Sequence, residues 1–205
     1  YTPLDTIFTP GTTAYMHNGA NGTTNTWFYF MTSDPNCVNG SSVNSDTVSN
    51  LDPEEPNITR VSVVNNKDVF IEWEASISSE TFAYIIYWDQ NASNAFSPID
   101  TVYGRLNTTY THISSADTRS ETYTVAAMDS CLNKGVYNIN KHKTMFLDDS
   151  IDRCSASSIL EWSPYDDWND GVGSYNVFLS LNGGTETQIS QLGSNTLSYT
   201  HGGLN

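Results

Sequence analysis

The tripeptide Tyr-x-His occurs three times in this chain of 205 residues and contains three of its four histidines. The copies begin at Tyr15, Tyr110 and Tyr199, so they lie 95 and then 89 residues apart. The sequence on either side of the first two copies also matches at the same offset. Self-similarity at a fixed period indicates a repeat architecture. The chain is therefore predicted to contain several copies of one structural unit.

The matching segments divide the chain into one complete copy and two partial ones. Residues 1–52 form the C-terminal half of a first copy, 53–147 a complete copy, and 148–205 the N-terminal half of a third. The front half of the unit repeats between the second and third copies, where 69–73 matches 158–162. Because the first residues already match the repeat, we expect the chain to be a segment of a longer protein.

The complete copy has the pattern of a β-sandwich, in which short alternating runs are separated by turn residues. Val69, Ile71 and Trp73 share one face of a run, and we expect Trp73 to fill the space between two sheets. The run 82–88 is apolar on both faces, which predicts a central strand. The seven expected strands span 58–64, 68–74, 82–88, 98–103, 108–113, 121–128 and 136–146. The predicted fold class is all-β, a row of tandem immunoglobulin-like β-sandwiches.

Two features of this pattern resemble a known domain. Trp73 closes the second expected strand, and the sequence Tyr-Thr-Val-Ala-Ala lies in the sixth, over 123–127. The copy thereby resembles a fibronectin type III domain. The resemblance implies that Trp73 packs in the core and that Tyr123 forms a tyrosine corner, in which its hydroxyl bonds to the backbone upstream.

Longer segments resemble a narrower group of proteins. These are the fibronectin type III-like repeats of gliding motility-associated exported surface proteins of Bacteroidota, which typically end in a type IX secretion signal domain. The segments that carry the likeness are 99–102 (IDTV), 128–131 (MDSC), 142–147 (HKTMFL) and 160–165 (LEWSPY), followed by Trp168 and Gly171-Val172. The resemblance implies an exported protein, outside the cell or at its surface.

The charge of the chain argues against two classes of partner. It has 23 Asp and Glu against 8 Lys and Arg, which gives a formal net charge of −15. Binding to nucleic acid or to anionic lipid requires clustered Lys and Arg, and no apolar run approaches the ~20 residues of a membrane span. We therefore expect neither nucleic-acid binding nor membrane insertion. The 21 Asn, 25 Ser and 24 Thr residues are typical of secreted β-proteins.

The candidate catalytic and metal-binding residues are weak. The histidines of the three motifs occupy one repeat-equivalent position, as packing residues do. Glu72 and Glu74 alternate with core residues, so they should lie on a solvent face instead of forming an acid–base pair. The loop 166–171 contains three aspartates, but Trp168 stands where a calcium ligand should be, and we expect it to cover a sandwich edge. We expect no enzyme activity, no cofactor and no metal site.

The three cysteines, Cys37, Cys131 and Cys154, form an odd set. Either one of them is free or all three are unpaired, and the sequence leaves the pairing open. Cys37 and Cys131 are expected in equivalent loops of different copies, and Cys154 just before the second strand of the third copy.

Exposed aromatic rings are candidates for binding sugars by stacking. Trp27, Trp88 and Trp168 are the residues considered, and Trp88 is preferred because Trp73 and Tyr84 already supply bulk to the core. The alternative is that these rings pack in the core or cover a sheet edge.

A triplet recurs along the chain in which Asp is followed by Ser or Thr and then by an apolar residue. Proteins of the resembled group are O-glycosylated at such triplets, so the resemblance implies candidate glycan sites at Thr6, Thr47, Thr101 and Ser150. The alternative is that Thr beside Val or Ile is there because it favours strands.

These inferences favour a non-catalytic spacer segment of a large, adhesin-like exported protein, whose partners are neighbouring repeats of the same parent chain. One alternative is a module that binds a surface glycan or protein through loop aromatics. Another is a set of accessory repeats of an exported hydrolase. For the partial copies, the favoured interpretation is a segment of a larger protein that contains the remaining halves. The alternative is head-to-tail strand complementation, in which the half of one molecule completes the half of the next.

Overall fold

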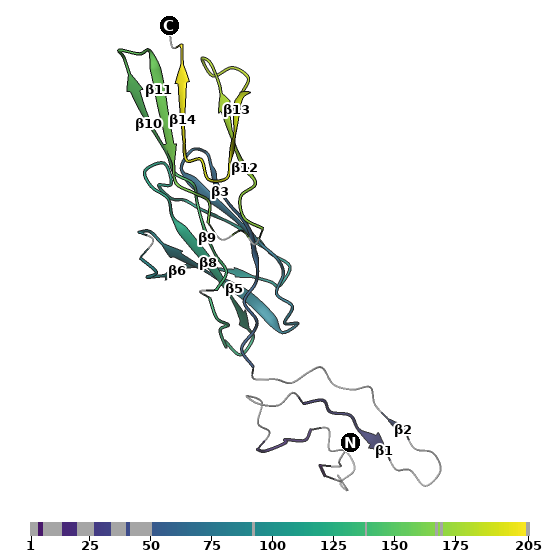
Figure 1. The fold of residues 1–205 in the computed structure, drawn as a ribbon. Coiled ribbons are helices and arrows are strands. Elements are labelled where there is room, and N and C mark those ends of the chain that lie inside the picture. The colour runs from purple at the N-terminus through teal and green to yellow at the C-terminus, as the bar shows by residue number, and fades with distance from the viewer. Residues whose placement is uncertain are drawn as a thin grey trace. The chain divides into compact units, whose positions relative to one another are not determined.

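The structure is a computed structural model that describes residues 4–5, 14–19, 27–33, 40–41, 51–91, 93–137, 139–166, 168 and 170–203. The chain forms two compact units, residues 1–51 and 52–205. All regular secondary structure in the described ranges is β-strand (Figure 1). Within these ranges, no helix has the length and apolar character needed to cross a membrane.

In the described part of the first unit, two short strands pair antiparallel, β1 (Thr32–Ser33) and β2 (Gly40–Ser41). Nearby in the sequence, Nδ1 of His17 lies 3.0 Å from the hydroxyl of Tyr29. This contact has a counterpart in the second unit, described below.

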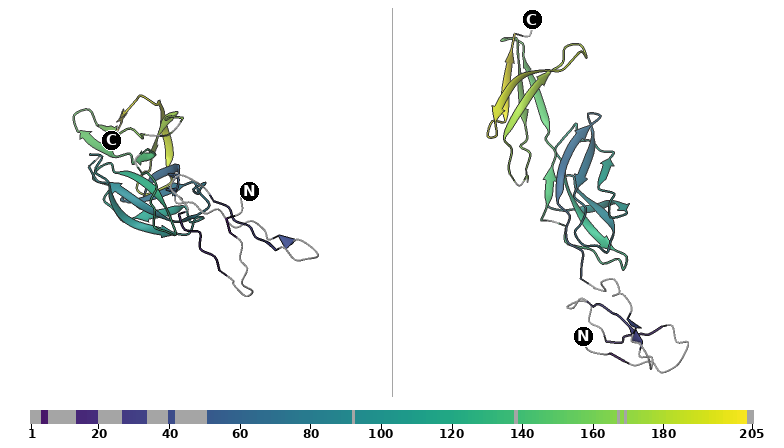
Figure 2. Two further views of the ribbon diagram at one scale, coloured as in Figure 1. Left: turned by 90° about the horizontal axis from the view of Figure 1, so that it is seen from below. Right: turned by 90° about the vertical axis from the view of Figure 1, so that its right-hand side faces the viewer.

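Two facing sheets form a complete sandwich at the start of the second unit, visible as the blue and teal strands in Figure 2. One sheet has the order β3-β4-β7, with β3 (Ile58–Val64), β4 (Asp68–Trp73) and β7 (Thr109–His112). The other has the order β6-β5-β8-β9, with β5 (Thr81–Asp89), β6 (Ser97–Tyr103), β8 (Thr122–Asp129) and β9 (Lys141–Lys143). All pairings are antiparallel. The fold is a fibronectin type III-like sandwich, which confirms the predicted fold class.

The alternation of side chains builds the core between these sheets. Trp73, at the end of β4, is 2% exposed and packs edge-on against Tyr84 of β5, with ring centroids 5.4 Å apart. The strand β5 is central, and side chains on both of its faces are buried, as its sequence predicted. The buried residues of the inner cluster are Ile58, Val61, Val69, Ile71, Trp73, Tyr84, Ile86, Ala116, Tyr123, Val125 and Ala127.

A second set of strands follows with the same arrangement. One sheet has the order β10-β11-β14, with β10 (Leu147–Asp152), β11 (Ser157–Trp162) and β14 (Ser198–Gly202). The pair β12 (Ser174–Leu179) and β13 (Thr187–Gly193) forms the other sheet. These five strands correspond to β3, β4, β5, β6 and β7 in order. Cys154 lies between β10 and β11, as predicted.

The repeat extends to the pairing of individual residues. In the β4–β7 ladder, Ile71 is opposite Tyr110 and Val69 is opposite His112. In the β11–β14 ladder, Leu160 is opposite Tyr199 and Ser158 is opposite His201. Each pair is displaced by the same 89 residues, so the two ladders have identical register.

The two core tryptophans also have the same surroundings. Trp162 packs edge-on against Tyr175, with ring centroids 5.6 Å apart, as Trp73 does against Tyr84. The backbone N–H groups of Trp73 and Trp162 each donate a 3.0 Å hydrogen bond to the carbonyl of a repeat-equivalent residue, Thr108 or Leu197. The prediction that one module is copied along the chain is therefore confirmed for the second and third copies.

The structure corrects the role expected for Tyr123. Its hydroxyl donates to the Glu121 carboxylate at 2.8 Å and lies 2.8 Å from Nδ1 of His112, so its partners are side chains and not the upstream backbone. The matching contact in the first unit, between His17 and Tyr29, aligns Tyr29 with Tyr123.

The last predicted strand is shorter than its pattern suggested. The expected strand 136–146 is reduced to β9, which pairs with Thr122–Thr124 of β8. The reason lies in Glu55, whose carboxylate accepts hydrogen bonds from the backbone N–H groups of Ile139 and Asn140 at 3.2 and 3.0 Å. These N–H groups bind a side chain, so they are not part of a strand ladder.

Candidate functional site: the joint between successive modules

The connection between the two sandwiches of the second unit is hydrogen-bonded to both of them. Thr144 is fully buried and exchanges hydrogen bonds with the backbone of Glu121, through its own N–H and its hydroxyl, both at 2.9 Å. Phe146 exchanges hydrogen bonds with Ser163 in the next module, also at 2.9 Å. The residues between β9 and β10 therefore act as a fixed connector and not as a loose linker.

A tyrosine from the third module lies against the second. Tyr165 follows β11, and Pro164 restricts the backbone before it. Its hydroxyl accepts a 3.0 Å hydrogen bond from the backbone N–H of Val61 in β3 and lies 2.9 Å from Nδ1 of His142 in β9. His142 is 3% exposed, and its ring packs edge-on against that of Tyr165 at 5.7 Å. One side chain thereby contacts strands from both sheets of the preceding module.

Trp168 lies beside Tyr165 and extends the same contact. The two rings are 4.6 Å apart, and the indole N–H of Trp168 donates to the carbonyl of Thr59 at 3.2 Å. The prediction that Trp168 covers a sandwich edge is confirmed, but the edge belongs to the preceding module. We call Thr59, Val61, His142, Tyr165 and Trp168 together the joint.

The joint covers backbone groups that the edge strand β3 would otherwise leave unpaired. A strand at the border of a sheet exposes backbone donors and acceptors that pair readily with other chains. Val61 N–H and Thr59 carbonyl are two such groups, and the joint occupies both with side chains. Each bond is worth about 0.5–1.5 kcal/mol, so the joint orients the modules by three modest hydrogen bonds and by the ring contact between His142 and Tyr165.

The second module has no equivalent aromatic anchor in the corresponding loop. Ser76 stands where the third module has Tyr165, and its N–H donates to the hydroxyl of Tyr84 inside its own module at 2.9 Å. The spacing between core Trp and Tyr is 11 residues there, from Trp73 to Tyr84, against 13 in the third module, from Trp162 to Tyr175. This longer, aromatic loop was the sequence signal for the joint.

The structure does not present Trp88 as an exposed platform, which corrects the prediction. It lies on the inner face of β5, partly buried against the core cluster, with its ring edge-on to His112 at 5.1 Å. Its indole nitrogen is buried and has no hydrogen-bond partner among the described residues. The reason is that Trp88 has the same parity as Tyr84 and Ile86, which both point into the sandwich.

The glycan candidates are spread along the chain. Thr101 lies in β6 and is partly buried, and Ser150 lies in β10 and is exposed. Thr6 and Thr47 lie outside the described residues. Burial, together with a hydrogen bond to the Asp100 carboxylate that precedes Thr101, raises the pKa of the Tyr110 hydroxyl.

The remaining sequence candidates are also separate from one another. Glu72 lies on the solvent face of β4 in an ion pair with Arg60 at 3.2 Å, as expected of a surface carboxylate. Cys131 and Cys154 carry free, exposed thiols, and Cys37 lies outside the described residues. Among the described side chains no group of three or more His, Cys, Asp or Glu is arranged to hold a metal ion.

Neither a family model nor a curated protein matches the sequence. Similar solved structures are fibronectin type III-like domains and arrays. An Fn3-like protein from Clostridium thermocellum is 14% identical, with a TM-score of 0.37, over 46% of this chain and 91% of that chain. The FN1–FN3 domains of chicken CNTN1 are 13% identical, with a TM-score of 0.40, over 85% and 66%. The central fibronectin-III array of RIM-binding protein is 16% identical, with a TM-score of 0.36, over 74% and 57%. The fold assignment rests on the strand order and register described above.

Proposed function

We propose that this chain is a non-catalytic spacer segment of a large exported cell-surface protein of the gliding motility-associated, adhesin-like type. In such a protein, successive sandwiches hold a distal module away from the cell, and the neighbouring repeats of the parent chain are the partners of each module. The observation that carries the proposal is the joint, because a spacer needs modules that keep their relative orientation.

The charge of the chain supports the same role. A formal net charge of −15 makes segments of the array repel one another, which keeps them soluble and discourages folding back. The fixed connector and the joint then resist bending at short range, while charge repulsion acts over about 8 Å at physiological ionic strength.

The experiment measures whether the joint holds two modules in one orientation. Cys131 and Cys154 are exposed and lie in different modules, so both accept a spin label in a Cys37→Ser background of the whole chain. Electron–electron distance measurements should give one narrow distribution for the parent. The double variant Tyr165→Ala/Trp168→Ala should give a broad one, because the connector alone then sets the orientation.

The matched control is Phe178→Ala. It removes an aromatic ring that is 57% exposed in β12 of the same module, outside the joint. Its distance distribution should remain narrow. A distribution that is already broad in the parent, or one that the joint variant leaves narrow, would contradict a rigid spacer held by the joint.

The export and glycosylation parts of the proposal need native material. Antibody labelling of intact host cells should detect the parent protein at the surface, and labelling only after lysis would contradict the proposed location. Thr101 and Ser150 are proposed glycan sites, together with Thr6 and Thr47. If the peptides that contain these four residues have the masses of the unmodified sequence, the glycosylation proposal is wrong. The spacer proposal does not depend on it.

A further inference from the structure

The four-stranded sheet of the complete module carries a second apolar cluster, on the face opposite the core. Its buried members are Ala83, Ile85, Tyr87, Ala126 and Met128, and Phe96 packs against them. This face is covered by the connection between β8 and β9. Within that connection, the ring of Tyr137 stacks on the ring of Tyr87, with centroids 4.0 Å apart and planes 3° from parallel. Tyr87 is 6% exposed and Tyr137 is 37% exposed, so the stack presents Tyr137 to solvent.

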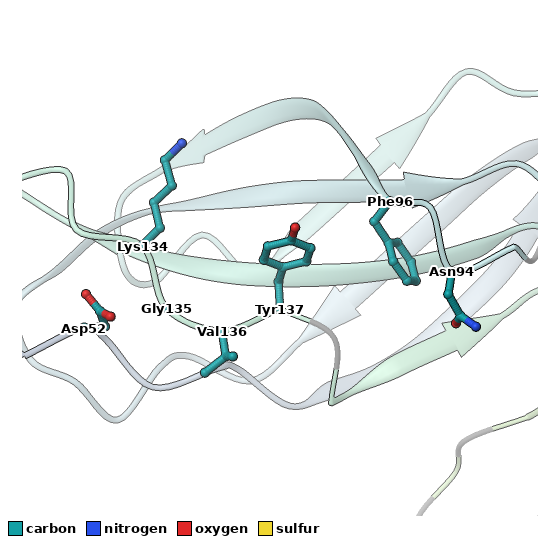
Figure 3. A pocket seen from close by; sticks show the side chains of 7 residues that line it. All are labelled: Asp52, Asn94, Phe96, Lys134, Gly135, Val136 and Tyr137. Carbon is teal, nitrogen blue, oxygen red and sulfur yellow. The ribbon is translucent and has the colours of Figure 1, made fainter.

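A groove of about 390 Å³ opens beside this stacked ring. Its apolar wall consists of Phe96, Val136 and Tyr137, and its polar groups are Asp52, Asn94 and Lys134. Figure 3 shows the Tyr137 ring between Lys134 on one side and Phe96 on the other, with Asn94 beyond Phe96 and Asp52 at the Lys134 end. The groove thus has an aromatic wall and hydrogen-bonding groups at both ends.

The backbone around the groove is held in place before any ligand arrives. Gly135 lies so close to Pro53 that an added Cβ would come within 2.1 Å of the Pro53 carbonyl oxygen, and its N–H donates to the Ala127 carbonyl at 2.9 Å. At the other end, Asn94 Oδ1 accepts a 2.9 Å hydrogen bond from Lys141 Nζ. A preformed site loses less conformational freedom on binding than a mobile one.

The chemistry of the groove selects a class of ligand. The face of an aromatic ring is electron-rich and attracts the C–H groups on the flat side of a sugar ring. A carboxylate, an amide and an ammonium group at the rim supply acceptors and donors for hydroxyl groups. The charges of Asp52 and Lys134 offset each other, and the net charge of −15 disfavours an anionic ligand. A volume of this size is within the range of small-molecule sites.

We propose that this groove binds a neutral oligosaccharide, with one sugar ring stacked on Tyr137 and its hydroxyls bonded to Asn94, Lys134 and Asp52. The role is additional to the spacer function and independent of the joint. It makes the complete module a weak surface-glycan receptor within the array.

The test titrates the whole chain with cellohexaose, xylohexaose, mannohexaose and maltohexaose by calorimetry and by NMR chemical shifts. We expect at least one of them to bind with a dissociation constant of about 0.1–1 mM, in the range of weak carbohydrate contacts that bury little area. Shifts should centre on residues 94–96 and 134–137. The absence of binding by all four at several millimolar would overturn the proposal.

Variants decide whether the stacked ring is responsible. Tyr137→Ala should weaken binding at least about tenfold, and Tyr137→Trp should retain it. Tyr103→Ala, which removes an exposed ring from β6 of the same module, and Trp168→Ala in the joint should bind like the parent. Equal losses in Tyr103→Ala and Tyr137→Ala would overturn the site.

Two further measurements keep the test decisive if Tyr137→Ala loosens the fold. Asn94→Ala and Lys134→Met alter rim groups without touching the stack, and each should weaken binding about threefold to tenfold. A neutral, extended Thr/Asn/Gly-rich peptide is titrated in parallel. Binding of that peptide as tightly as any sugar, with the same loss in Tyr137→Ala, would assign the groove to a peptide and overturn the saccharide proposal.

Discussion

A buried carboxylate organises one corner of the complete module. Glu121 is fully buried and accepts hydrogen bonds from the hydroxyls of Tyr123 and Ser114, and it pairs with Arg119 at 3.2 Å. The Tyr123 hydroxyl uses its one hydrogen to donate a hydrogen bond to the carboxylate. Nδ1 of His112 must therefore be the donor in its 2.8 Å contact with that hydroxyl. The repeated histidine therefore has a packing role with a defined tautomer, which agrees with its recurrence once per module.

The environment of His112 predicts a pH dependence. Burial lowers the pKa of His112 below its ordinary value of 6.5, although the charges of Glu121 and Asp68 act in the opposite direction. The unfolded chain then binds the proton more readily than the folded chain, so the free energy of unfolding falls as the pH drops from about 6.5 towards the lowered pKa. We expect His112→Gln to remove this part of the loss, measured by urea unfolding at about pH 7.5 and 5.5.

The other histidines are the same in both proteins, so the difference between parent and variant isolates His112. If both lose the same stability between the two pH values, the protonation of His112 is not coupled to folding and the assignment fails.

Trp73 fills part of the core of the complete module with one large side chain. Its side chain is 2% exposed between the two sheets, and truncation leaves a cavity that the rigid sheets cannot close. Trp73→Ala should lower the free energy of unfolding by about 3–5 kcal/mol, measured by denaturant unfolding followed by circular dichroism. Leu106→Ala, at a side chain that is 78% exposed, should change it by less than about 0.5 kcal/mol. A loss below about 1 kcal/mol for Trp73→Ala would contradict its central place in the core.

At the scale of elements, the connection between β8 and β9 is the part that departs most from simple strand alternation. It leaves the ladder after Asp129, crosses the outer face of its own sheet and returns as β9. Gly135 permits this path because its missing side chain lets the connection lie directly on Pro53.

The close approach at Gly135 predicts a large effect from one methyl group. Gly135→Ala places Cβ against a backbone oxygen that cannot move aside as a side chain could, so the connection must shift away from the sheet. We expect a loss of about 1–3 kcal/mol in the free energy of unfolding. Gly173→Ala is the control, since an added Cβ there meets no atom of the described residues within 4 Å. Equal stability of the two variants would show that the connection does not rest on Pro53.

The strands themselves could be predicted from the sequence because each buries alternate residues against one fixed partner. Val69, Ile71 and Trp73 share the inner face of β4, as predicted, and Tyr123, Val125 and Ala127 share that of β8 by the same alternation. The joint and the groove could not be predicted in this way. Tyr165 acts on residues 104 positions earlier, and Tyr137 stacks on the outer face of a strand, so neither contact leaves a local period in the sequence.

At the scale of the whole chain, the two sets of strands differ in how much they bury. In the complete module, every residue of β8 and nearly every residue of β5 is buried. Among the described residues of 147–203, Ser157 and Tyr175 are the buried ones. Protection against local opening follows buried contacts and shielded backbone hydrogen bonds.

This contrast predicts a graded pattern of amide hydrogen exchange. The amides of β5 and β8 should exchange slowest, and those of β12 and β13 should exchange faster by orders of magnitude, as measured by mass spectrometry on the whole chain. Uniform exchange across both sets of strands would mean that they unfold as one cooperative body, which the difference in burial does not support.

The shared displacement of 89 residues between the β4–β7 and β11–β14 ladders has a consequence for biosynthesis. Backbone groups alone cannot distinguish a strand from its counterpart in an adjacent copy, so a nascent chain could assemble a hybrid sandwich with every main-chain bond satisfied. Discrimination then falls to divergent side chains, such as Val69 facing His112 where Ser158 faces His201. Sequence divergence between the copies therefore protects against mispairing. Making their sequences more alike would favour misfolded products in which strands of different copies pair.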